Sequence, residues 1–172
     1  MLHLGVMALC DLGAEVWKVE LVGLTEKQRG PGPMVDGINT YFFSVNRGKK
    51  GITLNLKAPE GKEIFLKLAE SSDVVIDSFA PGVMGRLGLD YEAVAKRAPR
   101  IVYCSLSAFG QSGPWAQLEM NDPAHLALGG QMGVGGYSDP KETPIGGQGR
   151  QAYNAASVMM AHTITVALWD RM

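Results

Sequence analysis

Short apolar runs alternate along this sequence with segments of helical character, and this alternation restricts the fold more than any other feature. Runs with strand character lie at 14–20, 52–56, 73–77 and 101–106. Segments with helix signals lie at 2–12, from 59 onward, at 81–88, at 90–97 and at 150–171. Alternation of strands and helices is typical of parallel sheets whose strands are joined by helices. The sequence therefore predicts an α/β fold.

Punctuating residues set the boundaries of these segments. Gly13 follows the first helix, where glycine accepts a left-handed backbone, and Pro59 suits the first position of a helix. Asp122 is placed to cap a short helix. Residues 21–40 are rich in glycine and proline and are predicted to form a loop. The glycine-rich stretch 129–136 is predicted to be a connector, with a backbone cradle for an anion as the alternative.

The amino-acid composition limits the kinds of molecule that this protein is expected to bind. The net charge of −1 gives no general attraction to nucleic acid or to an anionic membrane. No apolar run approaches the roughly 20 residues that a transmembrane helix needs, and a cytoplasmic location without membrane association is expected. Cys10 and Cys104 stand far apart, without histidines at metal-ligand spacing. We expect reduced thiols and no metal site.

Basic residues follow several of the predicted elements. Arg47, Lys49 and Lys50 form a turn before one predicted strand, Lys57 follows that strand, and Arg86 lies beyond the next. Cations at the ends of successive elements of an α/β sheet can converge on a polyanion such as a phosphorylated cofactor. Solvated surface charge is the alternative interpretation.

Four blocks of the sequence resemble the class III (CaiB/BaiF-type) CoA-transferases, and they occur in the order found in that family. The blocks are 11–20 (DLGAEVWKVE), 46–61 (NRGKKGITLNLKAPEG), 73–89 (DVVIDSFAPGVMGRLGL) and 99–114 (PRIVYCSLSAFGQSGP). The resemblance implies a Rossmann-like large domain, a second smaller domain, and two subunits that interlock. Family members are much longer than this chain. Residues 1–172 are therefore expected to be the N-terminal part of the large domain, truncated at both ends, without the small domain and the C-terminal return segment.

The resemblance also implies a ligand and its contacts. Coenzyme A, as the free thiol or an acyl-CoA thioester, would be a substrate rather than a tightly bound cofactor, and carboxylic acids would be the second substrate. The positions that match the family's CoA contacts are Leu54, Lys57, Ser78, Phe79, Arg86 and Leu87. Ser78 departs from the family pattern, which more usually has asparagine there.

The family's catalytic residue is an aspartate near the start of the last helix, and this sequence departs from it. The carboxylate of that aspartate attacks the acyl-CoA carbonyl and forms a mixed anhydride. Counting back from the ending Ala-Leu-x-x-Arg at 167–171 places it at 152 or 153, where Ala152, Tyr153 and Asn154 stand. Neither tyrosine nor asparagine readily replaces a carboxylate nucleophile. The sequence therefore predicts a non-catalytic subunit that moves CoA only together with an aspartate-bearing partner.

An alternative remains open. The racemase branch of the family uses a histidine–aspartate pair before the short helix, and this chain has Asn121 and Asp122 there. Asp122 is thus a candidate acid or base, or a displaced carboxylate, in an active transferase or in an acyl-CoA racemase or isomerase. Either way the resemblance implies a dimer, formed with an identical chain or with a sister chain.

Overall fold

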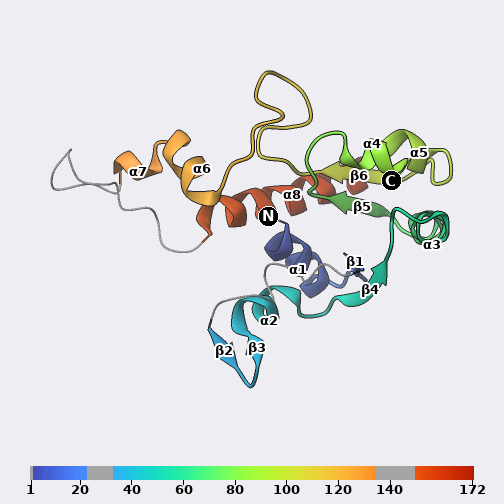
Figure 1. Ribbon diagram of the computed structural model, residues 1–172, viewed down its shortest axis with the longest axis horizontal. Coiled ribbons are helices and arrows are strands. Elements are labelled where there is room, and N and C mark those ends of the chain that lie inside the picture. The colour runs from blue at the N-terminus through green and yellow to red at the C-terminus, as the bar shows by residue number, and fades with distance from the viewer. Residues whose placement is uncertain (1, 23–32, 135–149) are drawn as a thin grey trace.

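The computed structural model describes residues 2–22, 33–134 and 150–172. Its elements follow one another in the order α1 (His3–Asp11), β1 (Trp17–Leu21), β2 (Met34–Val35), β3 (Ile38–Asn39), α2 (Thr40–Asn46), β4 (Lys50–Leu54), α3 (Pro59–Glu70), β5 (Val74–Asp77), α4 (Val83–Leu87), α5 (Tyr91–Ala95), β6 (Val102–Ser105), α6 (Asp122–Leu128), α7 (Gln131–Val134) and α8 (Gln151–Asp170). Along the chain, α2 lies between the paired strands β1 and β4, and α4 and α5 lie between the paired strands β5 and β6 (Figure 1). The predicted alternation is confirmed.

The strands of the described residues form three pairs. β1 runs parallel to β4, with Trp17 opposite Lys50 and Leu21 opposite Leu54. β5 runs parallel to β6, from Val74 opposite Val102 to Asp77 opposite Ser105, and β2 and β3 form an antiparallel hairpin. Both parallel pairs have the crossover connections expected of an α/β fold.

Several local predictions differ from the structure. The strand predicted at 52–56 lies at Lys50–Leu54. The strand predicted from residue 14 begins at Trp17. The loop predicted for 21–40 contains the β2–β3 hairpin, while 23–32 lie outside the described residues. The connector predicted at 129–136 includes α7 up to residue 134, and its last two residues are likewise not described.

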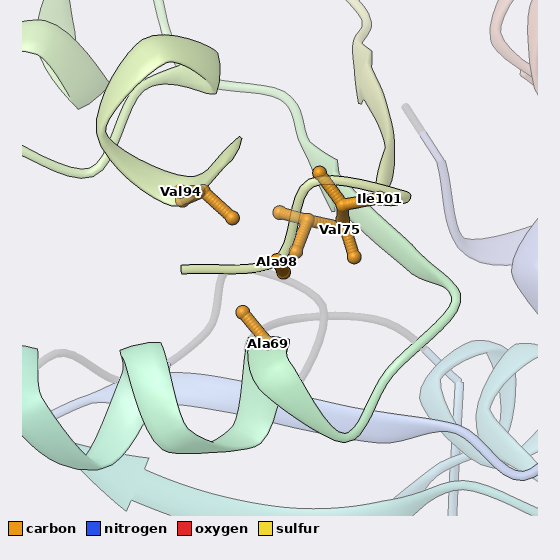
Figure 2. Packing of buried hydrophobic residues seen from close by; sticks show 5 residues of the cluster. All are labelled: Ala69, Val75, Val94, Ala98 and Ile101. Carbon is orange, nitrogen blue, oxygen red and sulfur yellow. The ribbon is translucent and has the colours of Figure 1, made fainter. Parts of the chain in front are cut away.

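Hydrophobic residues on both faces of β5 are covered. Val75 belongs to the buried cluster shown in Figure 2, which joins α3, α5 and β6 and contains Ala69, Val75, Val94, Ala98 and Ile101. Its neighbours Val74 and Ile76 pack on the opposite side, against the cluster of Val6, Met160 and Ile164 from α1 and α8. A strand covered on both faces is the expected position within a parallel α/β arrangement.

Helices α1 and α8 cross at very close range. The backbone N–H of Gly5 donates a hydrogen bond of 2.6 Å to Ser157 Oγ. A Cβ at position 5 would lie only 1.9 Å from the carbonyl oxygen of Ser157, so only glycine fits there. Along its length α8 also contacts α6 and β6, which places its first turn beside α6. No helix of the described residues is long and apolar enough to cross a membrane.

Candidate functional site

The apolar residues singled out by the family resemblance come together after β4 and β5. Leu54, the last residue of β4, is buried in a cluster with Leu56, Met84 and Leu89. Phe79 and Leu87 are partly buried and pack against that same cluster. Leu54 is therefore part of the buried cluster, whereas Phe79 and Leu87 pack against that cluster and keep part of their surface exposed.

The two predicted cations of this region are exposed. Lys57 lies in the turn between β4 and α3, and Arg86 lies on α4. The Arg86 guanidinium lies over Gly82, with Nη1 3.3 Å from where a Cβ would stand. Across the described part of the chain, neither side chain makes an ion pair or a hydrogen bond. Ser78 is exposed as well, directly before Phe79.

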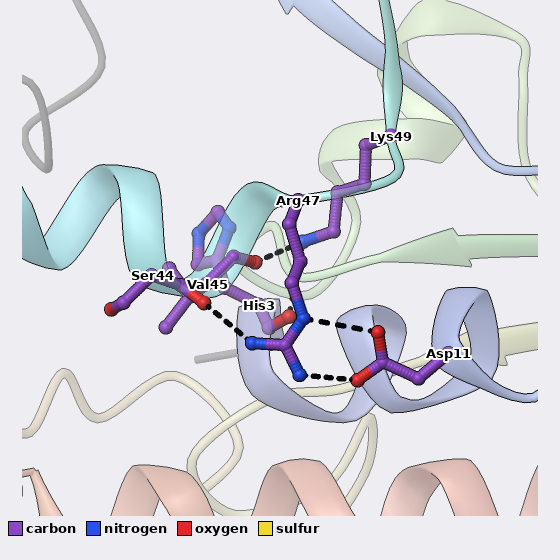
Figure 3. Close-up of polar contacts among 6 residues, drawn as sticks. All are labelled: His3, Asp11, Ser44, Val45, Arg47 and Lys49. Atoms are coloured by element: carbon purple, nitrogen blue, oxygen red, sulfur yellow. Dashed lines mark hydrogen bonds and ion pairs between the residues drawn. The ribbon is translucent and has the colours of Figure 1, made fainter.

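The three cations of the 46–50 turn are held by the chain itself, and Figure 3 shows the contacts of two of them, Arg47 and Lys49. Arg47 pairs with Asp11, its Nε donating over 3.1 Å. Lys49 Nζ donates to the carbonyls of His3 and Val45 at 3.0 and 2.8 Å. Lys50 forms an ion pair of 2.9 Å with Glu15, which lowers the pKa of that carboxyl, and lies over the Trp17 ring. The convergence of this turn with Lys57 and Arg86 on one polyanion stays a prediction.

A cavity of about 440 Å³ lies at the carboxyl ends of β5 and β6. Its polar lining comes from Asp77, Asp90, Tyr91, Tyr103, Ser105 and Gln111. The Tyr103 hydroxyl donates a hydrogen bond of 2.9 Å to the carbonyl of Leu89. Burial, together with the nearby charges of Asp77 and Asp90, raises the pKa of Tyr103. This tyrosine is therefore a neutral hydrogen-bond donor at physiological pH.

The first turn of α8 is tied to the first turn of α6. The backbone N–H of Tyr153 donates to Asp122 Oδ1 at 2.7 Å, and the Tyr153 hydroxyl donates to the Met120 carbonyl at 3.2 Å. Asp122 is only 6% exposed. Its Oδ2 is buried and has no hydrogen-bond partner within residues 2–22, 33–134 and 150–172. A carboxylate therefore lies beside position 153, but it belongs to Asp122 on α6 and not to a residue of α8.

The prediction that Asp122 caps α6 is wrong. Asn121 is the N-cap, its Oδ1 accepting from the N–H of Ala124 at 3.1 Å. Asp122 is the first residue of the helix, and its side chain turns to α8 instead. Asparagine and aspartate cap helices about equally well, so the tertiary contact decides which of the two does so.

His125 is a residue of this site that sequence reasoning missed. Its Nδ1 lies 2.8 Å from the Asn121 carbonyl, so Nδ1 carries the proton, and the buried Nε2 has no partner in the structure. The ring stacks on Phe109 and meets Tyr153 edge to face, both at 5.9 Å between centroids. Its position three residues after Asp122, one helical turn away, was the available signal.

Metal and thiol chemistry find no support in the described residues. No group of three or more histidine, cysteine, aspartate or glutamate side chains there could hold a metal ion. Cys10 and Cys104 are free, and burial raises the pKa of both thiols. Raised pKa values keep thiols protonated and weakly nucleophilic.

Comparison with known proteins decides the family. The family model described as CoA-transferase family III matches residues 2–172. The chain belongs to this family. It is similar to a crystallised CaiB/BaiF family protein from Brucella suis, with a TM-score of 0.88 and 34% identity over 98% of this chain and 45% of that one. Together with the element order, this similarity confirms the predicted fold class.

Several relatives of known activity are CoA-transferases. The chain is 43% identical over 143 residues to acetyl-CoA:oxalate CoA-transferase of Acetobacter aceti, covering 83% of this chain and 37% of that enzyme. It is 43% identical over 131 residues to human succinyl-CoA:glutarate CoA-transferase, covering 76% of this chain and 30% of that enzyme. The chain thus spans about a third of the length of the curated relatives it matches.

Proposed function

We propose that this protein acts in the transfer of CoA between carboxylic acids, with residues 1–172 contributing a CoA-binding part of the large domain. Family membership supports the reaction class. The exposed cation Lys57 directly follows Leu56 in sequence and the exposed cation Arg86 directly precedes Leu87, and these leucines share an apolar cluster with the partly exposed Phe79. Exposed cations with an adjoining apolar surface suit a ligand with phosphates and an aromatic base. CoA is such a ligand. Acyl-CoA and a free carboxylic acid are the proposed substrates.

We further propose that this chain lacks the carboxylate that carries the acyl group. The observation that carries it is the first turn of α8, which presents Ala152, Tyr153 and Asn154. The sequence has no aspartate or glutamate from residue 143 to residue 169. Transfer then requires an aspartate-bearing partner subunit in the assembly. A dimer with a sister chain fits this proposal better than a dimer of identical chains.

The buried Asp122 carboxylate favours a second candidate. Its Oδ2 has no hydrogen-bond partner among the described residues, and its Oδ1 accepts from the backbone N–H of Tyr153. In this alternative, an Asp122 oxygen attacks the thioester carbonyl, the C–S bond breaks, and CoA leaves as the thiolate. Asp122 would then carry the acyl group as a mixed anhydride in place of a residue on α8.

One experiment separates these candidates. The purified protein, with any co-purifying partner, is incubated with acetyl-, succinyl- or formyl-CoA and quenched with hydroxylamine or borohydride. Mass spectrometry then locates modified carboxylates. Labelling confined to a partner chain supports the non-catalytic subunit. An adduct on Asp122, lost in Asp122→Asn and retained in the matched control Asp90→Asn, overturns it in favour of the second candidate.

A further inference from the structure

The Asp77 carboxylate connects the end of β5 to two other segments. Ser105 Oγ, on the neighbouring strand β6, donates to Asp77 Oδ2 at 2.7 Å. The backbone N–H of Phe79 donates to Asp77 Oδ1 at 3.1 Å. Asp77 is 7% exposed, and both of its oxygens are occupied by donors from its own chain. A buried carboxylate with both oxygens occupied is a rigid anchor point.

Further backbone hydrogen bonds continue from this anchor to the exposed cation. The N–H of Val83 donates to the Ala80 carbonyl at 3.1 Å, and the N–H of Arg86 donates to the Gly82 carbonyl at 3.0 Å. Gly82 has a φ of +80°, a conformation that residues other than glycine rarely adopt. These hydrogen bonds and the Gly82 conformation therefore restrict the backbone between the anchored strand end and Arg86.

We infer that Asp77 is a positioning residue for the proposed CoA site: it fixes Phe79 and, through the following turn, Arg86, without touching the ligand. This inference rests on the proposed function. Ser78 and Phe79 directly follow the anchored strand end, so loss of the Oδ1 hydrogen bond frees the backbone on which both stand. Ser105 holds the carboxylate in the orientation that receives the Phe79 N–H.

The chain offers a matched control in Asp90. Asp90 lines the same cavity, and its Oδ1 likewise accepts a backbone N–H, that of Ala93, at 3.1 Å. It caps α5, however, and among the described residues its backbone hydrogen bond goes to Ala93 and not to the 78–82 segment. Asp77→Ala removes a buried acceptor and Asp90→Ala a partly buried one from the lining of the same cavity, and only the first releases Phe79.

The test measures CoA affinity by calorimetry and amide hydrogen exchange of residues 78–82 by mass spectrometry. We expect Asp77→Ala to weaken CoA binding at least fivefold and to speed exchange at Phe79, with Asp90→Ala changing affinity less than twofold and leaving that exchange rate unchanged. Asp77→Asn should restore near-normal affinity, because its amide oxygen still accepts from Phe79 and its NH₂ can donate to the Ser105 hydroxyl.

Three results would overturn the inference. Equal weakening by the two alanine variants would show a general effect on folding. Loss of affinity in Asp77→Asn as large as in Asp77→Ala would show that the carboxylate charge meets the ligand directly. Unchanged exchange at Phe79 in Asp77→Ala would show that Asp77 does not anchor the segment. Absence of CoA binding by the wild-type protein is a separate result: it refutes the proposed CoA site, and with it the ligand that Asp77 is inferred to serve.

Discussion

The cations of the 46–50 turn and the two exposed cations Lys57 and Arg86 have similar chemistry and different surroundings. Lys49 has three acceptors for its ammonium group, the carbonyls of His3 and Val45 and Oδ1 of Asn46. Lys57 and Arg86 have no such partner among the described residues. Satisfied cations stabilise the fold, whereas exposed cations without partners are available to a ligand. The difference predicts which substitutions reduce stability and which reduce CoA affinity.

The largest effect is expected at Lys49. Lys49→Met keeps the aliphatic stem and removes the donor of three hydrogen bonds. Hydrogen bonds to charged groups contribute about 1.5–3 kcal/mol each, without full additivity, so we expect the free energy of unfolding to fall by about 3 kcal/mol. Urea unfolding measures this loss. CoA affinity should stay within about twofold of wild type, and a large loss of affinity in a folded variant would contradict the division between the two groups.

Arg86→Ala should show the converse behaviour. Loss of a charge-assisted contact to phosphate should weaken CoA binding about tenfold or more. The free energy of unfolding should change by less than about 0.5 kcal/mol, as is usual for an exposed residue. Calorimetry and urea unfolding check the two expectations. Lys67→Ala, which removes an exposed cation from α3, serves as the control and should leave affinity unchanged; equal affinity for wild type and Arg86→Ala would remove Arg86 from the proposed site.

The neighbourhood of Lys49 also predicts a pH dependence. Burial, assisted by the charge of Lys49, lowers the pKa of His3 from 6.5 to about 3. Between these values the unfolded chain binds a proton that the folded chain does not, so stability falls as the pH drops from about 6.5 toward 3. His3→Gln should show a shallower loss of unfolding free energy between pH 7 and pH 4. Identical pH profiles would show that His3 does not titrate as described.

The smallest effect is expected at Arg47. Its ion pair with Asp11 is solvent-exposed, and solvent screens such pairs strongly. Arg47→Ala should therefore lower the unfolding free energy only slightly, and added salt should reduce the difference. Thermal unfolding at low and high ionic strength measures it. A several-fold loss of CoA affinity would instead place Arg47 with Lys57 and Arg86.

Elements with local signals were predictable from the sequence. Pro59 opens α3, and Asp90 caps α5, with its Oδ1 accepting from Ala93. The β2–β3 hairpin was missed because its strands have only two residues each. Its turn does carry a signal, since Asp36 and Gly37 both have positive φ and Asp-Gly is a favoured pair for such turns.

The candidate site was less predictable because its decisive contacts are distant in sequence. Which cations are satisfied depends on Asp11, 36 residues before Arg47, and on His3, 46 residues before Lys49. The role of Asp122 depends on Tyr153, 31 residues later. The sequence around each of these residues gives no sign of its distant partner. The family resemblance located the exposed surface of Phe79 and Arg86, and the anchoring of Phe79 by Asp77 required the structure.

The contact of Gly5 with Ser157 bears on how the chain folds. These residues are 152 positions apart, yet a single methyl group at position 5 would separate their helices. During synthesis, α1 leaves the ribosome before α8, so its buried face stays uncovered until α8 has been made. A contact of such long sequence separation also slows folding, because α1 and α8 must meet before the contact stabilises the fold. The packing of α1 against α8 is therefore expected to form late in folding.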